Sequence, residues 1–177
     1  RIRMHNFWGG VHDLYFYFER RDDYKKAHDL MREAAHKHKA FKYWRCQNMF
    51  TYITGKNWVE DRVGHPYDTE LYASTGGYNW SKVDEVYDEI VNRTGLIPIV
   101  EFNYMPECMA ADPTEIGAYS LSIISPPRDH NEWRSLIRNT VEHFQQRYGV
   151  YETRKWNFGV WNEPNHKIFY DFERYGY

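Results

Sequence analysis

Apolar positions recur along this chain with the spacing of amphipathic helices in three places. From residue 22 to about 38 they fall every three or four residues, and they do so again over 83–90 and over 133–148. Gly95 and Gly149 follow the second and third of these stretches, where a glycine commonly ends a helix. The pattern therefore predicts three helices with one apolar face each.

Short apolar runs separate the helical stretches and predict strands. These runs cover 41–45, 96–102 and 156–161, and their apolar content is typical of buried strands. The segment 54–77 is polar, rich in Gly and without a sustained period, so we expect a long loop of the kind that carries function on a rigid scaffold. Strands that alternate with helices of this length predict parallel pairing in βαβ units.

Two α/β folds fit this order of elements. An open doubly wound sheet that binds a nucleotide carries a Gly-rich phosphate turn after its first strand, and neither Gly9-Gly10 nor Gly76-Gly77 matches that motif. Long loops after the strands favour a TIM (β/α)8-type barrel instead. A complete barrel needs about 250 residues, so 177 residues with about four βα units correspond to roughly half of one.

Composition excludes some partners and leaves one question open. The formal net charge is −2, from 23 basic and 25 acidic residues without a basic block, so we expect no nucleic-acid partner. No apolar run approaches the ~20 residues of a membrane span, and two cysteines are too few for a disulfide framework. Aromatic residues make up 19% of the chain, which fits both stacking on sugars and a thick aromatic core.

The segment Trp161-Asn162-Glu163-Pro164 places a carboxylate where the last predicted strand ends. Pro164 has no N–H for a strand ladder, so pairing should stop there and leave Glu163 at the carboxyl end of the strand. A glycosidic oxygen leaves easily only when protonated, and a carboxyl group on a rigid strand end is suited to supply that proton. The alternative is an ordinary strand-to-helix cap, in which Asn and Glu are common.

The stretch 161–165 resembles the acid/base motif of glycoside hydrolase family 39, which contains β-xylosidases and α-L-iduronidases. The segments 78–84, 95–107 and 133–149 resemble the family in order and spacing, and the match covers most of positions 41 to 170. The resemblance implies the N-terminal half of a catalytic barrel in a retaining exo-glycosidase. It also implies that Glu163 is the general acid/base and that no metal or organic cofactor is needed.

Five further residues are candidates for contact with a saccharide substrate. The resemblance implies that Asn162 binds the sugar hydroxyl next to the anomeric carbon, and that His166 matches a histidine of the iduronidases, although a loop-capping role is equally open. Gln47 stands where the family usually has a sugar-binding histidine; it can still donate and accept hydrogen bonds. His12 and Tyr104 are candidates for lining the cleft, with ordinary packing as the alternative.

Retaining hydrolysis needs a second carboxylate about 5 Å from the first, and the resemblance places it on a seventh strand that these residues do not include. Glu101 is a plausible ion-pair partner for Arg45, and neither Glu101 nor Glu107 takes the nucleophile role in the family. We therefore expect an excerpt of a longer enzyme, with a split-barrel subunit or a self-associating half barrel as alternatives. The expected partner is the remaining half of the barrel, from the same parent chain or a companion chain.

The expected activity is that of a β-xylosidase, and an α-L-iduronidase is the alternative within the family. A chain that lacks the nucleophile also fits a different class of protein. It would then be a non-catalytic carbohydrate-binding module or a split-barrel subunit.

Overall fold

A four-stranded parallel sheet forms the centre of the structure, a computed structural model that describes residues 10–13, 22–46, 49–50, 78, 80–117 and 123–176. The strands lie side by side in chain order, and each pairs in parallel with the next. In chain order the elements are β1 (Gly10–Asp13), α1 (Asp22–His38), β2 (Tyr43–Cys46), α2 (Ser81–Asp88), the π-helical turn η3 (Glu89–Thr94), β3 (Ile97–Phe102), the 3-10 turn η4 (Glu107–Met109), α3 (His130–Tyr148), α4 (Val150–Thr153), β4 (Asn157–Val160) and α5 (Phe172–Tyr175).

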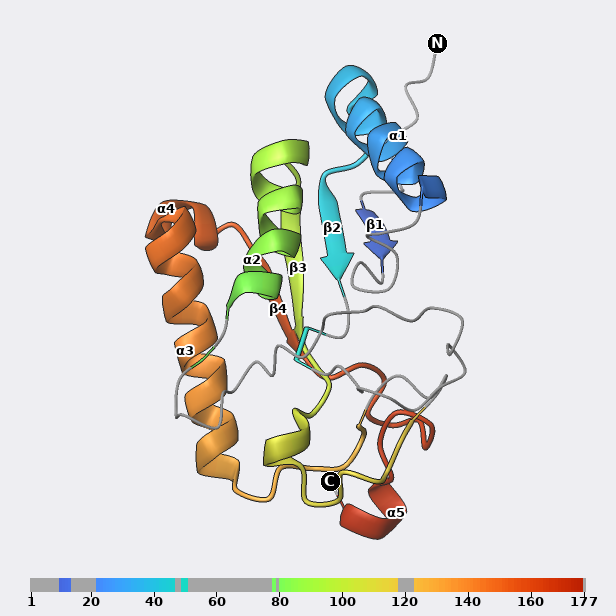
Figure 1. Ribbon diagram of the computed structural model, residues 1–177, viewed down its shortest axis with the longest axis vertical. Coiled ribbons are helices and arrows are strands. Elements are labelled where there is room, and N and C mark those ends of the chain that lie inside the picture. The colour runs from blue at the N-terminus through green and yellow to red at the C-terminus, as the bar shows by residue number, and fades with distance from the viewer. Residues whose placement is uncertain are drawn as a thin grey trace, which may run out of the picture.

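The main helices share one apolar core with the sheet. Trp44 of β2 and Val100 of β3 are fully buried in the same cluster as Ala35 of α1, Tyr87 of α2 and Phe144 of α3. Figure 1 shows α2 on the near side of β3, with α1 and α3 flanking it. Doubly wound sheets carry helices on both faces, whereas a barrel carries them on its outside, so this arrangement is consistent with part of a barrel.

The helices predicted from the apolar period are present. α1 covers the predicted range, α2 continues through η3 to Gly95 at φ 68°, and α3 ends before Gly149 at φ 88°. Both glycines have positive φ, which side chains other than glycine adopt at a steric penalty. The π-helical turn and the short α4 were not predicted. Within the described residues, no helix is long and apolar enough to span a bilayer.

Strand β4 is more exposed than the sequence pattern predicts. The prediction of a buried strand is wrong here, because Phe158 is 41% exposed and Val160 is 62% exposed. Phe158 stacks on Phe102 of β3 at a ring distance of 5.8 Å, so the side of β4 toward β3 is covered. β4 is the last strand of the described sheet, and its other edge pairs with none of the described residues. This is the open edge expected of a partial barrel.

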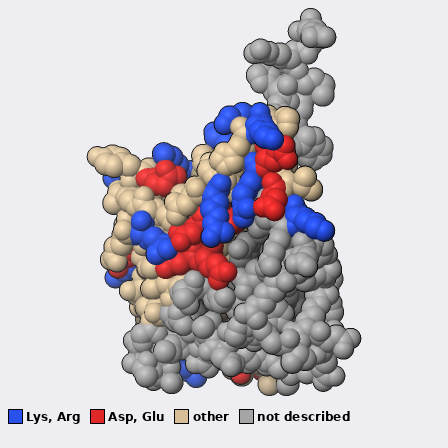
Figure 2. All heavy atoms as spheres, turned by 45° about the horizontal axis from the view of Figure 1, so that its top comes forward, with Lys and Arg blue, Asp and Glu red and all other residues tan. Residues whose placement is uncertain are grey.

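Charged residues on the helical layer pair with one another. The Glu89 carboxylate of η3 is 1% exposed and accepts hydrogen bonds from Arg32 Nε of α1 at 2.6 Å and Arg93 Nη1 at 3.1 Å. Figure 2 shows basic and acidic side chains interleaved on this face. The pair between Arg32 and Glu89 fastens α1 to the segment that enters β3.

Candidate active site

In the turn after β4, the side chain of Asn162 is buried and that of its neighbour Glu163 is exposed. Trp161 donates its backbone N–H to Phe102 O at 3.1 Å, so pairing with β3 continues one residue beyond the strand. Trp161 and Glu163 then adopt positive φ values of 66° and 44°, which are uncommon for residues other than glycine. Asn162 between them is buried, at 8% exposure, whereas the Glu163 side chain is exposed. The turn therefore presents a carboxylate beside a sequestered amide.

Asn162 is held from both ends of its amide. Arg45 Nη2 of β2 donates to Asn162 Oδ1 at 2.8 Å, and Asn162 Nδ2 donates to the Tyr104 hydroxyl at 3.3 Å. The same Arg45 nitrogen donates to Glu101 Oε1, so the predicted Arg45–Glu101 ion pair is confirmed. Three adjacent strand ends thus contribute to one polar network on the face of the sheet that carries Arg45 and Glu101.

Tyr104 combines a packed ring with a polar hydroxyl. It is 3% exposed, and its ring meets Trp161 edge-on at 5.3 Å and stacks on Phe169 at 6.2 Å. The pKa of Tyr104 is raised to about 12, chiefly by burial; the hydrogen bond from Asn162 opposes this rise, and the nearby charges of Glu101 and Glu163 contribute to it. Tyr104 is therefore a neutral phenol at physiological pH, close to Glu163.

Glu163 and His166 lie on the exposed turn that leaves the strand. The Glu163 carbonyl oxygen accepts the His166 backbone N–H at 2.8 Å, while its carboxylate makes no hydrogen bond to the residues that the structure describes. His166 Nδ1 lies 3.4 Å from the Ile168 backbone nitrogen, and the ring meets Phe169 edge-on at 5.9 Å. This geometry matches the loop-capping alternative for His166, and its exposed ring also leaves the predicted substrate contact open.

For two other predicted site residues, His12 and Gln47, the side chains lie outside the described part of the structure. The backbone of His12 in β1 pairs with Arg45 of β2, so His12 stands one strand away from the network, and its side chain lies outside the described part of the structure. Gln47 follows β2 and also lies outside the described residues. The structure thus brings Asn162, Tyr104 and Glu163 together, and the roles of all these residues remain predictions.

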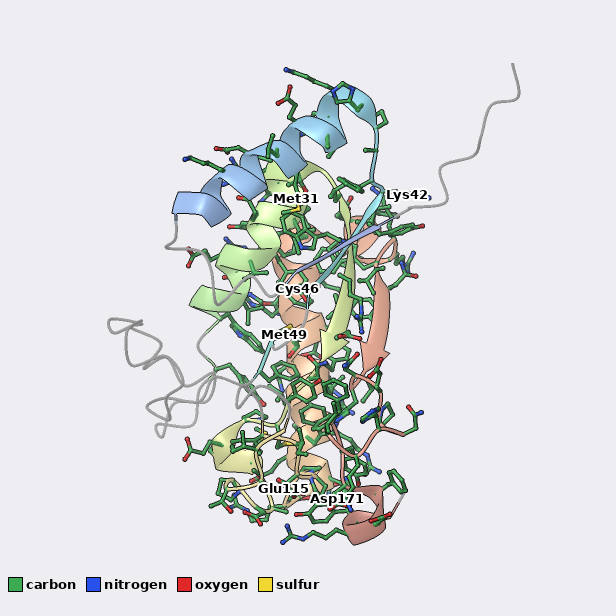
Figure 3. All side chains as sticks on the ribbon, turned by 90° about the vertical axis from the view of Figure 1, so that its right-hand side faces the viewer. Met31, Lys42, Cys46, Met49, Glu115 and Asp171 are labelled. Atoms are coloured by element: carbon green, nitrogen blue, oxygen red, sulfur yellow. The ribbon has the colours of Figure 1, made fainter. Side chains whose placement is uncertain are left out.

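The segment after Glu163 is fastened to the loop between β3 and α3. Arg174 of α5 reaches Asp112 in this loop at 3.1 Å, and within the segment itself Trp161 Nε1 donates to Phe169 O at 2.7 Å. Tyr175 donates its hydroxyl to Glu115 Oε2 at 2.5 Å, and Figure 3 shows Glu115 at the same end of the molecule as Asp171, the residue that precedes α5. No motif in the sequence indicates the contacts of Arg174 with Asp112 and of Tyr175 with Glu115, which join residues about 60 positions apart.

At Gly117 the loop after β3 comes very close to the segment after β4. A Cβ atom on Gly117 would lie 2.3 Å from Ile124 Cγ2 and 2.7 Å from the backbone oxygen of Ile168. Only a glycine allows the loop after β3 and the segment after β4 to approach so closely.

The chemistry available at this end of the sheet is that of a carboxylate, an amide and a phenol. Among the described residues, no group of three or more His, Cys, Asp or Glu side chains could hold a metal ion. A carboxylate that makes no hydrogen bond to the described residues can exchange a proton with a bound molecule, and the amide and phenol can orient hydroxyl groups.

Comparison with known proteins assigns the chain to a class of enzymes, the glycoside hydrolases. The family model "Glycosyl hydrolases family 39" matches residues 17–177, so the chain belongs to glycosyl hydrolase family 39. It is 37% identical over 117 residues to a β-xylosidase of Geobacillus stearothermophilus, a match to 66% of this chain and 23% of that protein. It is 32% identical over 134 residues to a β-xylosidase of Caldicellulosiruptor saccharolyticus, covering 75% and 26%. A 38-residue stretch is 42% identical to human α-L-iduronidase, covering 22% and 6%.

Solved structures of family 39 enzymes share the fold. A monomeric β-xylosidase from Caulobacter crescentus CB15 superposes with a TM-score of 0.69 at 26% identity, over 95% of this chain and 30% of that chain. The family 39 enzyme from Xanthomonas axonopodis pv. citri gives a TM-score of 0.67 at 27% identity, over 95% and 30%. The chain therefore spans less than a third of the length of these relatives.

Proposed function

We propose that this chain forms the N-terminal half of a (β/α)8 barrel, about its first four βα units, in a retaining exo-glycosidase. Four parallel strands in chain order and a helical layer sharing one core support this assignment. We further propose that another segment, from the same parent chain or a companion chain, continues the sheet beyond β4. The exposed edge of β4 and the small share of each relative that this chain covers support this proposal.

Glu163 is the general acid and then the general base of the proposed reaction. The observation that carries this assignment is its exposed carboxylate at the end of β4, next to a buried Asn162 and a neutral Tyr104. Glu101, the alternative carboxylate at a strand end, already accepts from Arg45 and is 6% exposed. The nucleophile is therefore assigned to a carboxylate outside these 177 residues.

In the proposed mechanism, Glu163 donates its proton to the glycosidic oxygen as the bond from that oxygen to the anomeric carbon breaks. The nucleophilic carboxylate forms a bond to the anomeric carbon at the same time, and the leaving group departs as a neutral alcohol that carries the proton from Glu163. The Glu163 carboxylate then removes a proton from water, whose oxygen displaces the enzyme carboxylate. Asn162 donates a hydrogen bond to the hydroxyl next to the anomeric carbon throughout.

A β-xyloside is the first choice of substrate. The alignments with β-xylosidases extend over 117 and 134 residues, which supports this choice over the α-L-iduronides. The 42% identity to α-L-iduronidase over 38 residues and the exposed His166 keep an α-L-iduronide as the second candidate. Assays of the full-length protein on aryl β-xyloside and aryl α-L-iduronide decide between them. Turnover of neither would refute both choices and favour a non-catalytic carbohydrate-binding or split-barrel subunit.

Glu163→Gln tests the acid/base role. In the full-length protein we expect kcat/KM for substrates with a poor leaving group to fall by about 10²–10⁴-fold, because that leaving group must be protonated. Substrates with a strongly acidic leaving group should lose much less in their first bond cleavage. Glu152→Gln, on α4 at the opposite end of β4, is a matched control that should leave the rates unchanged.

NMR of the first-formed sugar tests the stereochemical part of the proposal. Retention of the anomeric configuration is expected from a mechanism with a covalent intermediate, and inversion would contradict it. Equal rates for wild type and Glu163→Gln on all leaving groups would remove Glu163 from the mechanism.

A further inference from the structure

Arg45 dictates which end of the Asn162 amide faces it. An arginine side chain has only donors, so the group 2.8 Å from Arg45 Nη2 must be the carbonyl oxygen Oδ1. The oxygen and nitrogen of an amide have almost the same shape, and their orientation follows from the partners around them. With Arg45 on one side, the NH₂ group of Asn162 is directed away from β2.

The partner on the other side of the amide is consistent with this orientation. Asn162 Nδ2 donates one hydrogen to the Tyr104 hydroxyl at 3.3 Å, and Tyr104 is neutral. Nδ2 carries a second hydrogen, and among the described residues no acceptor takes it. A buried donor without an acceptor is unfavourable, and a ligand oxygen can satisfy it.

Glu101 holds Arg45 in place for this task. The two hydrogens of a single nitrogen, Arg45 Nη2, serve Glu101 Oε1 and Asn162 Oδ1, so the ion pair and the amide contact share one donor group. Glu101 also accepts from Asn103 Nδ2 at 3.3 Å, which adds a second fixed point on the carboxylate. The guanidinium is thus anchored by a buried charge before any ligand arrives.

We propose that Arg45 is a positioning residue that locks the Asn162 amide, so that a bound sugar meets an N–H donor beside Glu163 and never a carbonyl acceptor. This inference rests on the proposed function, which already gives Asn162 the contact with the hydroxyl next to the anomeric carbon. What it adds is the role of Arg45 in fixing the orientation of the amide that makes this contact. A purely structural Arg45 would only neutralise Glu101.

Substitutions that keep the shape of the site separate these two roles. Asn162→Asp keeps the acceptor for Arg45 and removes both N–H donors. Arg45→Lys keeps the positive charge for Glu101, but an ammonium group lacks the planar guanidinium that serves both partners in this geometry. Arg128→Lys is the matched control, because Arg128 is exposed in the loop before α3, where it donates to Cys108 O of η4 and pairs with Glu132 of α3.

The kinetic test uses the full-length protein on an aryl glycoside and on its analogue without the hydroxyl next to the anomeric carbon. For Asn162→Asp we expect kcat/KM on the complete sugar to fall roughly 10- to 100-fold, between the effects of an ordinary hydrogen bond and of a donor to a transition-state oxyanion. The loss on the deoxy analogue should be several-fold smaller. Arg45→Lys should show the same difference to a lesser degree, and Arg128→Lys none. Equal losses on both sugars for the Asn162 and Arg45 variants would overturn the proposal.

A second readout does not depend on turnover, so it separates this inference from the proposed function. With asparagine labelled by ¹⁵N, the side-chain signals of Asn162 are identified by their disappearance in Asn162→Asp. We expect these signals to shift in Arg45→Lys and to stay in place in Arg128→Lys. Unmoved signals in Arg45→Lys would overturn the proposal even in an active glycosidase. Shifted signals in a protein that cleaves neither glycoside would support the locked amide and reject only the enzymatic assignment.

Discussion

The buried carboxylate of Glu89 should contribute more to stability than Arg93, the more exposed of its two arginine partners. Glu89 is 1% exposed, whereas the side chains of Arg32 and Arg93 are 32% and 66% exposed. In Glu89→Gln the amide oxygen can still accept a hydrogen bond from Arg32. The amide NH₂ group, however, faces the Arg93 guanidinium, and because both groups are donors they cannot form a hydrogen bond. Breaking a buried ion pair costs about 3–5 kcal/mol, and the retained neutral hydrogen bond together with solvent screening reduces this to about 2–3 kcal/mol.

The matched comparison is Arg93→Met, which removes the exposed partner and leaves the bond between Glu89 and Arg32. Arg93 is mostly in solvent, where its charge is screened, and Glu89 keeps its bond to Arg32, so the loss should stay within the 0–1 kcal/mol typical of surface pairs, about 1 kcal/mol at most. Urea unfolding of the full-length protein gives both free energies, and hydrogen exchange of the α1 amides shows whether this helix opens first. Equal losses for the two variants would refute the reasoning, because the asymmetry in burial would then have no energetic effect.

Two further predictions concern the end of the sheet that carries Glu163. The pKa of Tyr104 is raised to about 12, so its hydroxyl stays protonated at every pH below about 10. Tyr104→Phe should therefore lower kcat/KM by about 2- to 12-fold, the effect of one hydrogen bond, without changing the shape of the pH profile between pH 5 and 9; a shifted limb would contradict this. Gly117→Ala should destabilise the protein by about 1–3 kcal/mol, since its Cβ would lie 2.7 Å from the Ile168 backbone oxygen. An unchanged thermal midpoint would show that the loop relaxes freely.

The helices were predictable because their apolar period reflects a local property of the chain. α1 and α3 each present one apolar face, and glycines mark the end of η3 and of α3. The burial of β4 was not predictable, because apolar residues such as Val160 indicate a strand without indicating whether a neighbour covers it. The number of strands in contact is a property of the assembled sheet.

In the candidate site, too, some contacts can be predicted from the sequence and others cannot. The Arg45–Glu101 pair followed from two neighbouring strand ends with opposite charges, and the structure confirms it. The bond from Arg45 to Asn162 spans 117 positions and depends on the turn at Trp161, whose positive φ no local motif predicts. For Tyr104 the sequence leaves packing and a place in the cleft as alternatives; in the structure its ring packs against Trp161 and its hydroxyl accepts a hydrogen bond from Asn162.

The contacts that fasten the segment after Glu163 have a consequence for engineering. Glu115 and Asp112 reach α5 through Tyr175 and Arg174, and Gly117 approaches Ile168. If only the loop after β3 or only the segment after β4 were exchanged between family 39 relatives, these contacts would join residues from two different proteins and would not be complementary. Transplantation of substrate preference should succeed when residues 103–129 and 161–176 move as one module, and chimeras with a boundary between them should lose catalytic geometry before they lose their fold.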